Sequence, residues 1–181
     1  MWRSQGIFGL VVSLFTAGLM VGGALSATVA WVAAGVLGWV PRPLRIATLV
    51  IIGLVVVARE LQLIHVKLPA NHRQVPQEIF EKGPYWSALQ FGFELGTGIR
   101  TYLPSAIPYL LLAAIVLLQA SFQVALVAGA CFGLGRATMA WSRTASQDSG
   151  SWDLSLRDRL RVIQSLAAVA SLVACATLFI G

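Results

Sequence analysis

The chain has 181 residues, of which 57% are hydrophobic and only 11% charged, and its mean hydropathy is +0.79. Soluble domains are about 25% charged, and one of this length leaves roughly a third of its chain surface in water, so the composition argues against a soluble fold. It favours an all-α integral membrane protein. The net charge of +6 comes from basic residues at the ends of apolar runs, not from a stripe interleaved with aromatic residues, so nucleic acid is not an expected partner.

The first apolar stretch lies between Arg3 and Arg42, where no residue is charged. As a helix it would be about 57 Å long, almost twice the roughly 30 Å hydrocarbon core, so we expect two spans rather than one. They are predicted at 7–24 and 27–40, with a turn within 22–28. A cleaved signal peptide is the alternative for the first of them, because Arg3 precedes an apolar run.

Four further spans follow from the same reasoning, which gives six in a single transmembrane domain covering the whole chain. Residues 101–135 are uncharged and too long for one crossing, and they contain a polar break at 119–123. Prolines and charges fill the segment after the third span, and a Ser/Asp/Gly-rich stretch precedes the last, so both are expected to be loops. The predicted spans are 44–62, 91–118, 123–141 and 162–180, and the predicted loops are 63–90 and 142–161.

Basic residues gather at one end of these spans. With six spans the two loops lie on the same side of the membrane, and they and their flanks hold most of the lysine and arginine. Because cytoplasmic loops carry an excess of these residues, we expect a multi-pass cell-membrane protein with both loops in the cytoplasm and both termini outside. The basic side has Arg59, Lys67, Arg73, Lys82, Arg136, Arg143, Arg157, Arg159 and Arg161, against Arg3, Arg42 and Arg45 on the other.

Two parts of the chain resemble each other. Residues 25–38 of the second predicted span can be aligned with 120–133, and Leu44-Arg45-Ile46 aligns with Leu160-Arg161-Val162. The similarity predicts two three-span halves, which must be related by inverted topology because three is odd. Inverted repeats are common in carriers whose site lies at the membrane midplane. A chance match within a small apolar alphabet is the alternative.

Residues 91–108 hold the features that indicate a functional site. Three glycines and two prolines interrupt the helix expected here, and freed backbone groups in a bilayer must be buried in protein or line a wet cavity. An acid and a base accompany the break, and ionisable groups at membrane depth indicate function. The predicted solute- or ion-binding residues are Glu94, Arg100, Thr101, Tyr102 and Ser105, and the predicted helix-break residues are Gly96, Gly98, Pro104 and Pro108.

The alternative is that the fourth span begins only at Thr101. In that case Glu94 and Arg100 lie in the cytoplasmic interface, where long charged side chains extend towards water. Residues 101–118 are long enough to cross a bilayer without the preceding segment. The sequence leaves both interpretations open.

The run Pro104-Ser105-Ala106-Ile107-Pro108 resembles the Pro-Cys-x-x-Pro-like motif of the CcdA/DsbD-like thiol–disulfide electron carriers of cytochrome c biogenesis, which share a superfamily with LysE-type exporters. Ser13-Leu14-Phe15-Thr16 resembles the lead-in to that family's first motif, and Gly133-Leu134-Gly135 is similar to a glycine pattern of its fifth span. The resemblance implies that helices one and four are broken. The redox cysteines are missing, since Ser105 stands in the cysteine position of one motif and Ala17-Gly18-Leu19-Met20-Val21 retains neither prolines nor cysteine.

Three functions are compatible with these features. The first is a carrier or exporter of a small solute or ion with a midplane site, and the second is a non-catalytic assembly factor or complex subunit that docks a protein partner through loop 63–90. The third is electron transfer through Cys131 and Cys175, which lie outside the motif positions. An enzyme is not expected, because His65 and His72 lie in a loop with no nucleophile arrangement nearby. No metal or cofactor is expected, and a homo-oligomer is left open.

Overall fold

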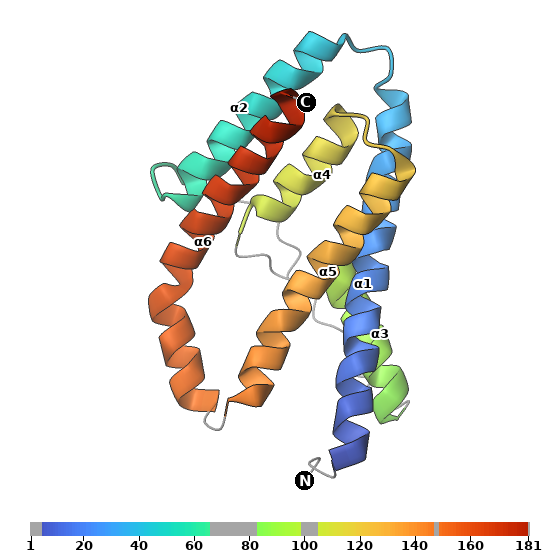
Figure 1. The fold of residues 1–181 in the computed structure, drawn as a ribbon, viewed down its shortest axis with the longest axis vertical. Coiled ribbons are helices and arrows are strands. Elements are labelled where there is room, and N and C mark those ends of the chain that lie inside the picture. The colour runs from blue at the N-terminus through green and yellow to red at the C-terminus, as the bar shows by residue number, and fades with distance from the viewer. Residues whose placement is uncertain (1–4, 66–82, 99–104, 147–148, 181) are drawn as a thin grey trace. The chain divides into compact units, whose positions relative to one another are not determined.

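The computed structural model describes residues 5–65, 83–98, 105–146 and 149–180. Within these ranges the regular structure is helical and no strand occurs, so the predicted all-α class is confirmed. Six helices follow one another along the chain (Figure 1). They are α1 (Gln5–Val36), α2 (Arg42–Glu60), α3 (Pro84–Thr97), α4 (Ile107–Leu117), α5 (Phe122–Ala145) and α6 (Ser149–Ile180).

Helix α1 is continuous over 32 residues. The predicted pair of spans at 7–24 and 27–40, with a turn within 22–28, is therefore wrong, and so is the break in the first helix that the family resemblance implied. The glycines that suggested the turn are packing positions: a Cβ on Gly23 would meet the backbone carbonyl of Gly129 on α5. Glycine weakens helices in water, but at helix contacts in lipid it lets two backbones approach closely.

The predicted fourth span, 91–118, is divided between two helices. α3 ends at Thr97, and Gly98 follows with a left-handed φ of 68°, its N–H donating to the carbonyl of Leu95. This geometry is a common helix C-cap and favours a residue without a Cβ. The next helix in the described part of the chain begins at Ile107. An interruption of the fourth predicted span is thus present.

Both predicted loops are shorter than expected. α3 already begins at Pro84, inside the predicted loop 63–90. α5 continues to Ala145 and α6 begins at Ser149, so most of the predicted loop 142–161 is helical.

The start of α6 has an amphipathic pattern that its polar composition conceals. Trp152, Leu156 and Leu160 recur every fourth residue and are half-buried, whereas Arg157 and Arg159 are exposed. A spacing of four places the three apolar side chains on one face of a helix. The charged residues that suggested a solvated loop occupy the other face.

Two helices are long and apolar enough to cross a membrane, Gly9–Val36 in α1 and Phe122–Arg143 in α5. Ile107–Leu117 is apolar but shorter. These findings come from length and composition within the described residues. They support membrane association and do not confirm the six predicted spans.

Contacts divide the chain into two compact units. The first contains α1 up to Val29, together with α3 and α5. The second contains the end of α1 from Ala30, together with α2, α4 and α6. Each unit takes helices from both predicted three-span halves, so the contacts do not divide the chain as the sequence repeat predicted.

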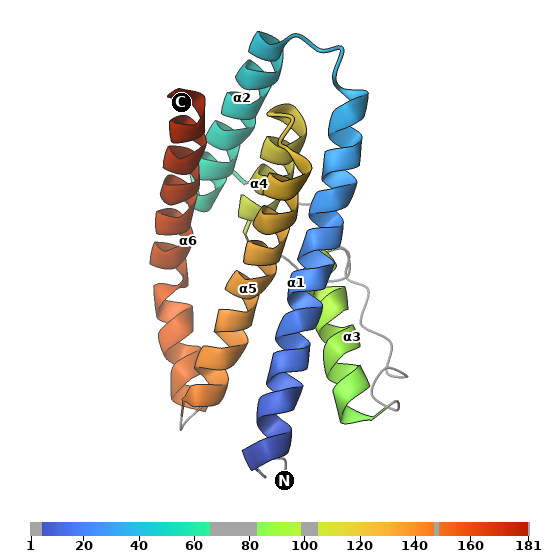
Figure 2. The ribbon, with the colours of Figure 1, turned by 45° about the vertical axis from the view of Figure 1, so that its right-hand side comes forward.

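In the first unit α3 and α5 pack against α1 at glycines (Figure 2). A Cβ on Gly92 or Gly96 of α3 would collide with the backbone of Phe15 or Leu19, and one on Gly133 of α5 would collide with Leu19. Backbones in direct contact leave little room for large side chains. Among the described residues, Leu19 is the one large side chain that is fully buried, with 1% of its surface exposed.

In the second unit α2, α4 and α6 contact one another. The core between α2 and α4 consists of Leu49 and Val56 with Ala106 and Leu110. Side chains rather than backbones meet here, which is the usual packing of helices through ridges and grooves.

Candidate functional site

The five predicted binding residues are only partly described by the structure. Arg100, Thr101 and Tyr102 lie outside the described residues. Glu94 is half-buried on α3 in the first unit, and Ser105 precedes α4 in the second. The grouping of these five side chains into one site therefore stays a prediction.

The four predicted helix-break residues have different roles. Gly98 ends α3 in a left-handed conformation, as a break requires. Gly96 is inside α3 and packs against the backbone of Leu19. Pro108 lies in the first turn of α4, where a backbone N–H would have no intrahelical acceptor. The proline therefore removes no hydrogen bond of the helix, and it starts α4 rather than interrupting it. Pro104 lies outside the described residues.

A buried carboxylate holds the start of α4. Oε1 of Glu60 accepts a hydrogen bond from the backbone N–H of Ala106 at 2.7 Å and another from Nη1 of Arg59 at 2.8 Å. The Glu60 side chain is 2% exposed and that of Arg59 is 19% exposed. A carboxylate at a helix N-terminus is favoured by the helix dipole and by the unpaired N–H groups there.

Each early N–H donor of α4 has an acceptor, and two of these acceptors are side chains. Ala106 N–H donates to Glu60, and Ile107 N–H donates to Oγ of Ser105 at 3.2 Å. Pro108 has no N–H, and Tyr109 N–H already donates to the carbonyl of Ala106. The start of α4 is therefore fully capped without water, which is the requirement for a helix end at membrane depth.

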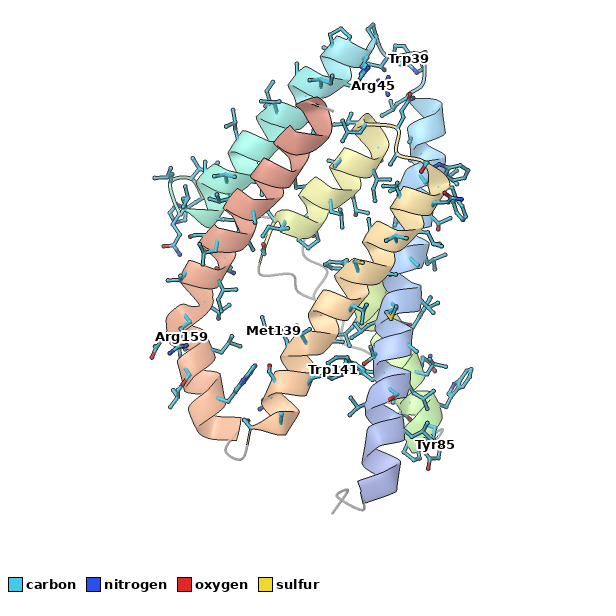
Figure 3. All side chains as sticks on the ribbon, in the orientation of Figure 1. Trp39, Arg45, Tyr85, Met139, Trp141 and Arg159 are labelled. Carbon is cyan, nitrogen blue, oxygen red and sulfur yellow. The ribbon has the colours of Figure 1, made fainter. Side chains whose placement is uncertain are left out.

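The opposite end of α4 carries the opposite charge. Nη1 of Arg45, in the first turns of α2, donates to the carbonyl of Leu117 at 3.2 Å. A cation at a helix C-terminus complements the negative end of the dipole. One helix, α2, thus supplies the anion for one end of α4 and the cation for the other; Figure 3 shows Arg45 near the start of α2.

Glu60 was missed by the sequence analysis, although a signal for it exists. The buried residues of α2 are Leu49, Gly53, Val56 and Glu60, spaced four, three and four apart. This helical spacing places Glu60 on the core face of α2. Its position beside Arg59 at the end of an apolar run instead made it resemble an interfacial charge.

The residues tied to the family resemblance have structural contacts of their own. Gly18, within the segment that resembles the first motif, packs against the backbone of Leu89 and Phe93. The Ser105 hydroxyl caps α4. Cys131 is a free, exposed thiol, and the side chain of Cys175 lies outside what the structure describes. In the described part of the chain, no group of three or more His, Cys, Asp or Glu side chains could hold a metal ion.

Comparison of the chain with protein-family models, with curated proteins and with solved structures finds no match. The resemblance to thiol–disulfide carriers therefore stays a prediction, and the function has to be argued from the geometry of this chain.

Proposed function

We propose that this protein is a multi-pass membrane carrier of a small solute or ion, with its working centre at the capped start of α4. The observation that carries the proposal is a buried charge at the end of a short apolar helix. α4 has 11 residues and is about 16 Å long, roughly half the thickness of a hydrocarbon core. A helix of this length in a bilayer ends at membrane depth, as the half-helices of carriers do.

The choice of a carboxylate as the cap supports a functional role. A hydroxyl or amide would satisfy the Ala106 N–H without the cost of burying a charge. Ionisable side chains inside membrane segments are rare for this reason, and they mark solute and ion pathways. Glu60 is accordingly proposed to bind the transported cation or the coupling proton.

The continuous α1 also changes the proposed topology. If α1 crosses once, the N-terminus lies on the same side as the segment between α2 and α3 and the α5–α6 connection, and the C-terminus lies opposite. Arg3 then joins the basic side, which leaves only Arg42 and Arg45 on the other side. Because basic residues favour the cytoplasm, we propose an N-terminus inside and a C-terminus outside, in place of two outside termini.

Reconstituted vesicles test the carrier function. Solid-supported-membrane currents would be recorded for a panel of monovalent and divalent cations, small carboxylates and amino acids, using wild type, Glu60→Gln and Asp158→Asn. Asp158 is an exposed acid on α6 and is the matched control. We expect currents for at least one solute, retained in Asp158→Asn and at least tenfold smaller in Glu60→Gln. Equal currents in all three proteins, or a wild type no different from empty vesicles, would contradict the proposal.

A docking role is the second candidate, and exposed aromatic residues favour it. Tyr85 and Trp86, in the first turn of α3, are 42% and 54% exposed (Tyr85 is labelled in Figure 3). Exposed aromatic side chains are typical anchors of protein interfaces. Affinity purification from membranes with Tyr85→Ser/Trp86→Ser would test it: a partner retained by the double variant would argue against docking here.

A further inference from the structure

An open groove lies between the end of α1 and the turn that follows α4. Its volume is about 380 Å³, and both of its walls belong to the second unit. It is lined by Trp31, Val32, Ala34, Gly35, Gln119 and Ala120. Most of these residues are apolar, and an apolar groove with a few polar groups is the usual form of a ligand site.

Gly35 contributes open space to the groove. A Cβ built on it meets nothing within 4 Å, whereas a Cβ on Gly18 or Gly22 of the same helix would collide with the backbone of α3. A glycine inside a helix costs about 1 kcal/mol relative to alanine, and at Gly35 no neighbouring helix of the described chain uses the space that it leaves. This space is free for a molecule from outside the chain.

The groove lies at the end of the membrane-length part of α1. That segment ends at Val36, so Trp31 and Gly35 lie in its last two turns. Trp31 is 38% exposed, and Trp39, just beyond the segment, is 81% exposed (Trp39 is labelled in Figure 3). Exposed tryptophans gather where the hydrocarbon meets the lipid head groups. In the proposed membrane setting, the groove therefore lies where the acyl chains of a phospholipid join its head group.

A cation without an anionic partner lies beside the groove. Nη1 of Arg45 donates to the carbonyl of Leu117 at 3.2 Å, and Gln119 of the groove wall follows Leu117 by two residues. Two residues of chain span at most about 7 Å, so this nitrogen lies within about 10 Å of the Gln119 backbone. Nε of Arg45 is buried without a hydrogen-bond partner among the described residues. The acceptor that Arg45 does have is a neutral carbonyl, which leaves its charge uncompensated.

The segments that build the groove and carry this arginine contain no acidic residue. Neither 30–59 nor 105–121 includes an aspartate or a glutamate. Arg42 adds a second, exposed cation three residues before Arg45. Glu60, at the other end of α2, follows Arg45 by 15 residues, which is about 22 Å along the helix. The local charge is therefore positive and complements an anionic partner.

We propose that this groove binds one anionic phospholipid. An acyl chain lies against Trp31 and Val32, and the phosphodiester pairs with the guanidinium of Arg45, for which a fork of N–H donors is well suited. One leaflet with its head groups is about 20 Å deep, so a single lipid spans the separation between Arg45 and Gln119. Basic pockets between membrane helices are established head-group sites in other proteins. The inference needs a membrane but not transport, so it is independent of the carrier function.

Native mass spectrometry of the full chain, released from detergent micelles, tests the site with phosphatidylglycerol and phosphatidylcholine of identical chains. Both lipids contain a phosphate, but in phosphatidylcholine the choline cancels its charge. We expect wild type to retain one phosphatidylglycerol about fivefold more tightly than phosphatidylcholine, the typical contribution of one basic residue. Arg45→Gln should remove this preference. Gly35→Leu should weaken the binding of both lipids about fivefold or more, because the leucine side chain fills the groove.

Two variants serve as matched controls and should bind as wild type. Gly9→Leu adds the same side chain to α1 at a position where a Cβ also meets nothing within 4 Å, and Arg157→Gln removes an exposed arginine of α6. A single gel-filtration peak and wild-type tryptophan fluorescence establish that each protein is folded. Since Arg45 also caps α4, Gly35→Leu keeps the test decisive if Arg45→Gln does not fold.

Three results would overturn the inference. Folded wild type could retain neither lipid, or both lipids equally. Gly35→Leu could bind phosphatidylglycerol as tightly as wild type, or folded Arg45→Gln could keep the preference. A species of twice the chain mass that excludes lipid, and that Gly35→Leu abolishes, would assign the groove to a second copy of the chain instead.

Discussion

In the first unit the helices approach until backbone meets backbone, whereas in the second they are held apart by leucine and valine side chains. Gly18 and Gly22 of α1 face α3, and Gly23 faces α5; a Cβ at any of the three would collide with main-chain atoms. In the second unit Leu49, Val56 and Leu110 fill the space between helices. Within a bilayer both arrangements can hold helices together, because helix association there depends on close packing rather than on the exclusion of water.

Polar groups are also placed differently in the two units. In the second, the charges of α2 stand at the two ends of α4 and complete its hydrogen bonding. In the first, polar side chains recur every three or four residues along α3, and buried atoms of Gln90 and Arg136 have no partner among the described residues. The charges of α2 therefore complete the hydrogen bonding at both ends of α4, although Nε of Arg45 is itself buried without a hydrogen-bond partner among the described residues.

The largest effect is expected where backbones touch. Gly133→Leu places a side chain against the backbone of Leu19 and Met20, so α5 must move away from α1. We expect a loss of about 3 kcal/mol in the free energy of unfolding, at the upper end of the cost of overpacking. Unfolding in mixed detergent–SDS micelles, followed by tryptophan fluorescence, measures it. Gly135→Leu is the matched control on α5, because nothing lies within 4 Å of a Cβ there, and an equal loss in both would contradict the backbone-contact account.

Removing the carboxylate from the second unit is expected to have the next largest effect. Glu60→Ala leaves the buried Ala106 N–H and the Arg59 guanidinium without their acceptor, which should cost about 2 kcal/mol of unfolding free energy. Glu60→Gln keeps an oxygen acceptor and should lose less. The same micelle titration compares them. A Glu60→Gln variant as unstable as Glu60→Ala would show that the charge, not the hydrogen bond, holds the start of α4.

A cavity in the second unit should lower the free energy of unfolding less than overpacking in the first. Leu110→Ala removes a side chain that is 2% exposed, and we expect a loss of about 1.5 kcal/mol. This is below the value for aqueous cores because, in the proposed membrane setting, lipid tails are as apolar as leucine and the transfer contribution is lost. Leu54→Ala, at a position that is 58% exposed on α2, should change little. A loss above that of Gly133→Leu would reverse the comparison between the units.

The sequence predicted most accurately the helices that charges delimit. The predicted span 44–62 corresponds to α2, which has arginine near its start and Arg59 with Glu60 at its end. Charge gives a local signal, since a charged group cannot enter lipid without a partner. The interruption of the fourth span was also predictable, because glycine and proline act on the backbone at their own positions.

The features that sequence could not predict depend on neighbours far along the chain. In the sequence, Gly22 and Gly23 indicate a turn. In the structure they are helical positions packed against the backbone of Phe93 and Gly129. Glu60 resembles an interfacial acid until Ala106 is found donating to it, 46 residues away. The wrong turn and the missed carboxylate have the same physical cause: the role of a small or charged residue in a helix depends on the helix packed against it, and a single sequence does not identify that helix.

The smallest expected effect concerns a hydrogen bond that joins two side chains in the first unit. Nε1 of Trp141 on α5 donates to Oγ1 of Thr16 on α1 at 3.1 Å, and Thr16 Oγ1 donates to the carbonyl of Val12 (Trp141 is labelled in Figure 3). Because Thr16 keeps its own backbone acceptor, loss of the indole N–H leaves no buried donor unpaired on α1. Trp141→Phe should therefore cost only about 0.5 kcal/mol, the typical value for hydrogen bonds between membrane helices.

A double-mutant cycle with Thr16→Val isolates this bond from the packing of the indole ring. If glycine contacts hold α1 and α5 together, the coupling energy between the two substitutions should stay near 0.5 kcal/mol. A coupling several times larger would mean that the first unit, like the second, depends on a polar link between its helices. The contrast between a unit joined by backbone contact and a unit joined through charged helix ends would then be lost.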